Sequence, residues 1–298
     1  SPRCRQSGRL SSSFSSAWQF LLAMYSGVRK TSTRRAARMA ALHASFKPTL
    51  TLHVPATLQA MLALPTWEAL DLSDLRAVSI GSTDVPIELI AALQDRGIPV
   101  LQIYGATESG PISIFQTIDQ ALAAPGSIGK APSGVEIKLQ NAKGQEPGLD
   151  EPGEILIKAP NLANRYWPDK ALIDADGFWA SGDVASLDAD GVYWFRDRLK
   201  NVIISGGENI YPAEIERVLR AVSGINDCCV VGVPSQRWGQ TPVAVIEGDA
   251  RPLAPIQQQL KDELARFKHP SRITFVDALP RNAMGKVVRE DVRALVLE

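Results

Sequence analysis

The sequence of 298 residues contains few cysteines and no long apolar run. Its three cysteines include the adjacent pair Cys228 and Cys229, a spacing that fits neither a zinc site nor a disulfide framework. We therefore expect buried thiols in a reducing compartment. No apolar run approaches the roughly 20 residues that a membrane-spanning helix requires. An apolar share of 45% with 22 glycines and 20 prolines also excludes a coiled coil, a collagen-like repeat and a wholly disordered chain.

Acidic residues are missing from the first 47 residues, although the whole chain has no formal net charge. That segment is rich in serine and holds nine of the 32 lysines and arginines, so the remaining 251 residues carry 23 bases against 32 acids. We expect residues 1–47 to be an atypical basic leader, either disordered or misread, with a mitochondrial transit peptide as the alternative. The mildly acidic remainder gives no reason to expect nucleic acid or an anionic membrane as a partner.

Residues 48–197 show two successive patterns. Apolar strands over 75–80 and 100–104 flank a helix over 87–95, and this spacing is typical of a βαβ unit in a parallel sheet. After Gly126, apolar and polar residues alternate and Asp-Gly turns separate the segments. The second pattern predicts a small antiparallel sheet or barrel.

Residues 198–298 form a third part, of a size usual for an independent domain. We expect a strand over 201–205, a helix that begins at Pro212, a helix over 256–267 and a last helix over 287–297. The predicted fold class is thus α/β: the remnant of a parallel sheet, a small antiparallel barrel-like part, and an α+β C-terminal domain.

Two glycine-containing motifs follow the predicted parallel strands. They are residues 81–86, which read Gly-Ser-Thr-Asp-Val-Pro, and residues 104–110, which read Tyr-Gly-Ala-Thr-Glu-Ser-Gly. Ligands of parallel α/β sheets bind beyond the carboxyl ends of the strands, where Gly81 and Gly105 fall. A glycine there lets a ligand approach the backbone closely.

Side chains in two motifs have the chemistry to bind a nucleotide. Tyr104 offers a flat face on which a base can stack, Thr107 can bond a phosphate oxygen, and Glu108 is a hard oxygen ligand suited to Mg²⁺. Asp183, in Ser-Gly-Asp, can accept two hydrogen bonds from a ribose diol. Taken singly, each motif also fits a plain loop or a common turn.

The segment Asp-Arg-Leu-Lys-Asn at 197–201 lies between the second and third parts. Arg198 can bind a ribose or a phosphate, and Lys200 occupies a place where a hinge could turn. A charged linker would have much the same sequence, so this motif alone does not decide between the two.

Two later motifs contain glycines that can serve a function. Gly206 and Gly207 would let a narrow thiol arm pass close to the backbone, although a hairpin turn with a helix cap would look alike. Lys286 ends the segment 280–286, Pro-Arg-Asn-Ala-Met-Gly-Lys, on a glycine-containing loop. It is either a solvated surface lysine or a mobile cation that offsets charge developing between a carboxylate and a phosphate.

Together, in this order and at these separations, the motifs resemble the acyl-adenylate-forming superfamily of acyl-CoA synthetases, luciferases and peptide synthetase adenylation domains. The resemblance covers residues 48–298, and residues 205–216 are most similar to the acid–CoA ligase branch. It implies that an acid and ATP give an acyl-adenylate and pyrophosphate. A mobile C-terminal domain then swings about a hinge, and CoA attacks to give a thioester and AMP.

The same resemblance implies the domains, the cofactors and the site. Residues 48–197 would be a truncated AMP-binding N-terminal domain and residues 198–298 a lid domain. The partners would be a small carboxylic acid, ATP, Mg²⁺ and CoA, in the cytoplasm, or in the mitochondrial matrix if the leader is a transit peptide. The implied roles are nucleotide binding by Gly81, Ser82, Thr83, Tyr104, Gly105, Thr107, Asp183 and Arg198, catalysis by Thr107, Glu108 and Lys286, Mg²⁺ binding by Glu108, the hinge at Lys200, and CoA binding by Ser205, Gly206 and Gly207.

One expected feature of the family is missing upstream of Tyr104. We find no Ser/Thr/Gly-rich phosphate loop, because residues 11–16 are rich in serine but contain neither glycine nor lysine. The predicted function is therefore an ATP-dependent acid–CoA ligase that is truncated and impaired in this chain. The alternatives are a unit that loads a carrier-protein thiol and a non-enzymatic nucleotide- or CoA-binding remnant. The segment 109–112 carries no cation that a dicarboxylate would need, which favours an apolar or aromatic acid.

Overall fold

The computed structural model describes residues 32–81, 85–225, 227–249, 252–282 and 285–297. The chain divides into two compact units, residues 1–47 with 57–72 and residues 48–56 with 73–298. In the described part, no helix combines the length and the apolar character that crossing a membrane demands.

The first unit contains α2 (Ser32–Phe46) and most of α3 (Pro55–Leu62). In α2, one face is buried at the helical spacing i, i+3, i+4 and i+7, by Ala36, Met39, Ala40 and His43. This helix differs from our expectation of a leader without regular structure. The alanines, leucine and methionine among its arginines favour a helix, and the buried face supplies the packing that stabilises it.

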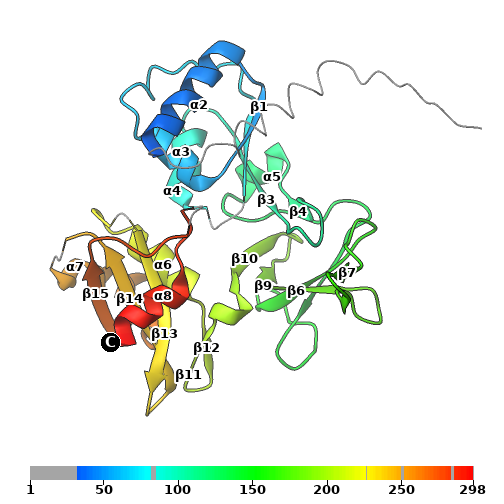
Figure 1. The fold of residues 1–298 in the computed structure, drawn as a ribbon, viewed down its shortest axis with the longest axis vertical. Coiled ribbons are helices and arrows are strands. Elements are labelled where there is room, and N and C mark those ends of the chain that lie inside the picture. Colours follow the sequence, from blue (N-terminus) through cyan, green and yellow to red (C-terminus); the bar gives the residue numbers. More distant parts are fainter. Residues whose placement is uncertain (1–31, 82–84, 226, 250–251, 283–284, 298) are drawn as a thin grey trace, which may run out of the picture. The chain divides into compact units, whose positions relative to one another are not determined.

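The second unit begins with a sheet in the order β1-β2-β3-β4 (Figure 1). The first three strands are parallel, and β4 pairs antiparallel with β3. Helix α4 connects β2 to β3, which confirms the predicted βαβ unit. The bounds are β1 (Leu50–His53), β2 (Ala77–Ile80), α4 (Ile87–Gln94), β3 (Val100–Tyr104), β4 (Ile114–Phe115) and α5 (Ile118–Ala123).

An antiparallel sheet in the order β10-β9-β6-β5 follows. Its buried side includes Ile155, Ile157 and Trp179, at alternating positions of β6 and at the start of β9. Among the described strands this sheet stays open, so the barrel-like part has the form of a sheet with two edges. The bounds are β5 (Glu136–Gln140), β6 (Gly153–Lys158), β9 (Trp179–Leu187) and β10 (Tyr193–Arg198), with a separate hairpin of β7 (Arg165–Tyr166) and β8 (Lys170–Ala171).

The C-terminal part contains a five-stranded sheet in which β12-β11-β14-β13 are neighbours and β15 pairs with β14. Helices pack on both of its faces, because alternate residues of β13 point to opposite sides. Cys228 and Val230 pack with α6 and α7, whereas Cys229 and Val231 pack with α8. The bounds are η1 (Leu199–Asn201), β11 (Ile203–Ser205), β12 (Glu208–Ile210), α6 (Pro212–Arg220), β13 (Asp227–Ser235), β14 (Gly239–Glu247), α7 (Leu253–Glu263), η2 (Arg266–Lys268), β15 (Arg272–Val276) and α8 (Arg289–Leu297).

Several predicted boundaries differ in the structure. The strand expected over 75–80 begins at Ala77, and the helix expected from residue 256 begins at Leu253. The strand expected over 201–205 begins only at Ile203, after the 3₁₀ turn η1. The helix expected over 256–267 runs over α7 and ends at Glu263, because Leu264 takes an extended conformation and is buried. The last helix begins at Arg289 rather than at residue 287.

The adjacent cysteines are both free and buried, as expected. Burial raises the pKa of the Cys229 thiol to about 12, so it stays protonated at neutral pH. Their packing on opposite faces of one sheet gives these two residues a structural role.

Candidate active site

The loop that follows β3 packs closely against neighbouring segments of the chain. Gly105 approaches the chain so closely that a Cβ atom there would lie 2.6 Å from the carbonyl oxygen of Pro111, so only glycine fits. Ser109 is buried, and the Asn161 side chain donates a 2.9 Å hydrogen bond to its carbonyl oxygen. This bracing leaves Thr107 exposed on the outer side of the loop.

Asp183 and Arg198 face each other across two paired strands. They are direct partners in the antiparallel register of β9 and β10, and the Arg198 Nε lies 3.1 Å from the Asp183 Oδ1. The Asp183 side chain is 8% exposed and that of Arg198 is 51% exposed. The hydroxyl of Tyr104 donates a 3.0 Å hydrogen bond to Asp183 Oδ2. Strand pairing therefore brings a buried carboxylate, a half-exposed guanidinium and an aromatic hydroxyl together.

The Asp183 carboxylate retains capacity to accept hydrogen bonds. Its Oδ1 is buried and receives no hydrogen bond from the described residues, although Arg198 forms an ion pair with it. Burial raises the pKa of Asp183, and the charges of Arg198 and Lys286 and the Tyr104 hydrogen bond offset only part of that effect. Burial and the nearby Asp183 raise the pKa of Tyr104, so its hydroxyl stays protonated and acts as a donor. A ligand hydroxyl pair would satisfy this buried acceptor.

Glu108 lies in the same loop as Thr107 and is half-buried. The hydroxyl of Tyr166 donates a 3.0 Å hydrogen bond to its Oε1. The described residues contain no group of three or more His, Cys, Asp or Glu side chains that could hold a metal ion. Mg²⁺ in nucleotide sites commonly uses one or two carboxylates with water and phosphate oxygens, and one carboxylate such as Glu108 fits that pattern. The role of Glu108 stays a prediction.

The segment after β10 is ordered by Asp197, a residue to which we assigned no role from the sequence. Its Oδ1 accepts hydrogen bonds from the Arg198 backbone N–H at 2.6 Å and from the Asn201 side chain at 2.9 Å. Its Oδ2 accepts one from the backbone N–H of Ala213, in the first turn of α6, at 2.7 Å. The buried Asp197 thus joins β10, η1 and α6, while the predicted hinge residue Lys200 is exposed in η1. A helix start without a capping side chain of its own is the signal that could have revealed it.

The hairpin between β11 and β12 contains the predicted CoA residues. Ser205 ends β11, and Gly206 and Gly207 both have positive φ angles, of 61° and 91°. A Cβ atom at Gly206 would lie 2.8 Å from the Trp238 ring, whereas one at Gly207 would meet nothing within 4 Å. The backbone conformation therefore requires glycine at both positions, and the second faces open space.

Lys286 lies on an exposed loop before α8, yet its ammonium is affected by distant parts of the sequence. Partial desolvation and the positive charge of Arg198 lower the pKa of Lys286, and Arg289 and Lys200 act in the same direction. The carboxylate of Asp183 acts against them and raises it. The charges of Asp183 and Arg198 thus both act on the Lys286 ammonium.

The remaining predicted residues lie at the ends of β2 and β3. Gly81 follows β2, and a Cβ atom there would lie 2.8 Å from the carbonyl oxygen of Ile103 in the neighbouring strand. Ser82 and Thr83 lie outside the described residues. Gly81 and Gly105 therefore both lie at the carboxyl ends of parallel strands, as the sequence predicted, and each packs closely against the chain itself. Their role in binding a nucleotide stays a prediction.

Two protein-family models match this chain. The sequence model of AMP-binding enzymes matches residues 10–167, and that of the AMP-binding enzyme C-terminal domain matches residues 214–286. The chain belongs to the AMP-binding enzyme family. The first match begins inside the basic segment 1–47, so the family's sequence pattern extends into residues that their composition had set apart.

Curated members of the AMP-binding enzyme family match most of this chain. The indoleacetate–CoA ligase of Aromatoleum aromaticum is 42% identical over 254 residues, which are 83% of this chain and 50% of that protein. The feruloyl-CoA synthase of an Amycolatopsis species is 38% identical over 272 residues, or 85% of this chain and 55% of that protein. The chain spans about half the length of the curated relatives it matches.

Solved structures of acid–CoA ligases superimpose on most of this chain. An anthranilate CoA ligase in complex with anthranoyl-AMP superimposes with a TM-score of 0.78 at 30% identity, covering 88% of this chain and 52% of that one. The o-succinylbenzoate CoA synthetase of Bacillus subtilis, in complex with its acyl-adenylate, gives 0.78 at 29% identity, covering 87% and 53%.

Proposed function

We propose that this chain carries the nucleotide-binding edge and the lid of an acid–CoA ligase that forms an acyl-adenylate and then a CoA thioester. The observation that supports this most strongly is the Asp183 carboxylate. It is buried beside Arg198 and Tyr104, and its Oδ1 receives no hydrogen bond from the described residues. The names of the relatives, which are CoA ligases and a feruloyl-CoA synthase, agree with this reaction class.

In the proposed nucleotide site, Asp183 accepts hydrogen bonds from the ribose hydroxyls. The Arg198 guanidinium lies opposite and keeps the carboxylate charged and oriented. The Tyr104 hydroxyl is already committed to Asp183, which holds the ring at the end of β3 where a base can stack on it. Gly81 and Gly105 keep the strand ends free of side chains, and Thr107 is exposed to bond a phosphate oxygen.

The first step joins two anions. A carboxylate oxygen of the acid attacks the α-phosphorus of ATP, the acyl–phosphate bond forms, and pyrophosphate leaves. We assign the Lys286 ammonium to the negative charge that accumulates on the phosphorus oxygens, a contact whose loss typically costs ~10²–10³ in rate. Mg²⁺, held by Glu108, would supply further charge neutralisation when bound.

The second step needs the same site without that lysine. The CoA thiol loses its proton to solvent and its sulfur attacks the acyl carbon; the carbon–sulfur bond forms, and AMP leaves with the bonding electrons of the carbon–oxygen bond. We infer that Lys200 is the hinge about which the lid turns, and that Ser205, Gly206 and Gly207 border the passage of the thiol arm. The open space beside Gly207 supports this role, because it would let a thiol arm approach the backbone there.

For the acid, we propose an aromatic carboxylic acid. Two relatives carry indoleacetate and feruloyl groups in their names. The segment 109–112 contains no cation for a second carboxylate, and Ile112 in it is an exposed apolar residue. A cytoplasmic location stays a prediction.

The experiment separates the two half-reactions. Synthetic indoleacetyl-adenylate and CoA are mixed with the full chain, and the thioester and AMP are quantified, while ATP–pyrophosphate exchange is measured in parallel with indoleacetate or ferulate. Thioester formation that depends on Asp183 and not on Asp190, an exposed turn residue, is the expected result. Absence of both thioester formation and exchange would leave the chain a binding remnant and refute the proposal.

A further inference from the structure

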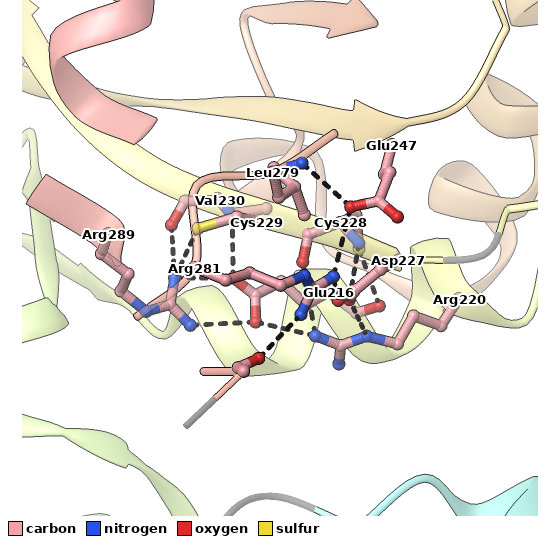
Figure 2. Close-up of polar contacts among 11 residues, drawn as sticks. Glu216, Arg220, Asp227, Cys228, Cys229, Val230, Glu247, Leu279, Arg281 and Arg289 are labelled. Atoms are coloured by element: carbon pink, nitrogen blue, oxygen red, sulfur yellow. Dashed lines mark hydrogen bonds and ion pairs between the residues drawn. The ribbon is translucent and has the colours of Figure 1, made fainter. Parts of the chain in front are cut away.

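A second set of charged residues, which includes Arg281, Asp227, Glu247, Glu216 and Arg289, lies at the C-terminal sheet and its helices (Figure 2). The Arg281 Nη2 lies 2.6 Å from Asp227 Oδ2, at the start of β13, and 3.2 Å from Glu247 Oε2, at the end of β14. The Nη1 of the same guanidinium donates a 3.2 Å hydrogen bond to the carbonyl oxygen of Gly285. Arg281 thus connects two strand ends with the residue that precedes Lys286.

Inside the loop, Asn282 connects the two sides. Its side-chain oxygen accepts a 3.0 Å hydrogen bond from the backbone N–H of Lys286, and its own N–H donates one of 2.9 Å to the Lys286 carbonyl oxygen. Its carbonyl oxygen accepts a further hydrogen bond, also 2.9 Å, from the N–H of Gly285. The backbone of Lys286 is therefore tied to Asn282, and that of the preceding Gly285 to both Arg281 and Asn282.

The far end of the loop is fixed independently. Arg289, the first residue of α8, forms a bidentate pair with the buried Glu216, with nitrogen–oxygen distances of 2.6 and 2.9 Å. It also donates a 2.7 Å hydrogen bond to the carbonyl oxygen of Val230. With Arg289 anchored, the freedom of Lys286 depends on what holds the residues before it.

We propose that Arg281 is a positioning residue for Lys286, because its guanidinium ties the Gly285 carbonyl to Asp227 and Glu247. The proposal builds on the role inferred above for Lys286 in the first half-reaction. The planar fork of an arginine can bridge three acceptors, whereas the ammonium of a lysine cannot do so with the same geometry. Asp227 and Glu247 are only 24% and 26% exposed, so these pairs are better shielded from water than ordinary surface pairs.

The ionisation state of Asp227 also supports its role as a partner of Arg281. Burial by itself raises the pKa of Asp227, but the hydrogen bond from Arg281 and the charge of Arg220 outweigh it and lower the pKa. Asp227 therefore stays ionised at neutral pH and remains a partner for both arginines.

The test is hydrogen exchange of the full-length chain, followed by mass spectrometry of the peptide that spans residues 281–288. In Arg281→Gln we expect exchange in this peptide to become about tenfold faster, because a charge-assisted contact that closes the loop is lost. The peptides of β13 and β14 should keep their rates. Arg281→Lys, which retains the charge, should show most of the increase, and Arg293→Gln, on the exposed side of α8, should show none.

A second readout follows Lys286 itself. The groups that act on its ammonium are Asp183, Arg198, Lys200 and Arg289. A released loop takes Lys286 out of this partly desolvated and mostly positive environment, so its pKa should rise toward the ordinary value. The rate at which a limiting amount of an amine-reactive acylating reagent modifies Lys286 should then reach its midpoint at higher pH in Arg281→Gln and in Arg281→Lys. Arg293→Gln should show no such shift.

Two results would overturn the positioning role. One is unchanged loop exchange in both Arg281 variants, and the other is faster exchange spread evenly over the whole C-terminal sheet. If Arg281→Gln does not fold, Arg281→Lys carries the test. Neither readout requires turnover, so a chain that lacks ligase activity would refute the proposed function without affecting this result.

Discussion

The β9–β10 ladder and the loop of residues 280–288 both direct charge at the candidate active site, but they hold it differently. Asp183 and Arg198 are register partners in one antiparallel ladder, so the backbone pairing itself fixes them. Lys286 lies in a short loop closed on itself by an isolated β-bridge between Arg281 and Val287, and the ion pairs of Arg281 and Arg289 hold that loop to the neighbouring elements. The comparison indicates that the pair to which we assign nucleotide binding is fixed by strand pairing, whereas the ammonium to which we assign catalysis is attached by side-chain contacts that a domain movement could carry as one piece.

The largest effect should come from the buried anchor of the loop. Glu216→Gln leaves the half-buried Arg289 without the charge of its bidentate partner, and breaking a pair with a buried member costs up to ~3–5 kcal/mol. Hydrogen exchange at increasing urea concentration should show this loss in β13, β14 and α8 and not in β5, β6 and β9.

The control for that variant is Glu263→Gln, an exposed residue at the end of α7, which should change stability by less than ~0.5 kcal/mol. Equal destabilisation of the β5–β10 sheet would show that the two regions do not differ as we describe.

The next effect separates the two half-reactions. Lys286→Ala should slow ATP–pyrophosphate exchange by ~10²–10³, because the variant loses a charge contact to the pentavalent phosphorus. Thioester formation from a preformed acyl-adenylate should keep its rate. Lys261→Ala, an exposed lysine of α7, should affect neither reaction. An equal loss in both half-reactions would contradict a lysine that serves only the first.

The smallest effect is a pH dependence at the rigid site. Burial raises the pKa of Asp183 above its unfolded value, so the folded state binds this proton more tightly. The stability gained in this way is present at low pH and is lost as the pH rises through the folded pKa. Urea unfolding between about pH 3 and pH 7 should show that the stability of the wild type relative to Asp183→Asn falls as the pH rises. Asp190→Asn should follow the wild type, and a parallel course of wild type and Asp183→Asn would contradict the raised pKa.

Much of the strand-paired region could be predicted from the sequence. The alternation of apolar residues and the Asp-Gly turn at 190–191 indicate a hairpin, but an unbroken register would pair Asp183 with Asp197. A register shift between Phe195 and Asp197 pairs Asp183 with Arg198 instead, and that shift was not predicted. The Tyr104 contact joins residues 79 positions apart, so it required the fold. The family motifs identified Tyr104, Asp183 and Arg198 as candidates, but the sequence did not predict that the three side chains contact one another.

The anchors of the loop could not be predicted in the same way. Arg281 contacts Asp227 and Glu247, which lie 54 and 34 positions away in the sequence. Charged residues on an exposed loop follow no regular spacing, so the sequence does not indicate which distant residue each one contacts. Asp197 was missed because one of its three hydrogen bonds caps a helix that starts 15 positions later. Helix α2 was not predicted because the arginine- and serine-rich composition indicated a segment without regular structure. The small and apolar residues at helical spacing in this segment were overlooked.

The most direct test of the central claim is a calorimetric titration of AMP and of its 2′,3′-dideoxy analogue into the wild type, Asp183→Asn and Asp190→Asn. If the Asp183 carboxylate accepts hydrogen bonds from the ribose diol, the wild type and Asp190→Asn should prefer AMP by about tenfold to a hundredfold, as expected for hydrogen bonds to a charged group. Asp183→Asn should bind both nucleotides with nearly equal, weak affinity. An Asp183→Asn variant that retains the preference for AMP would contradict the account.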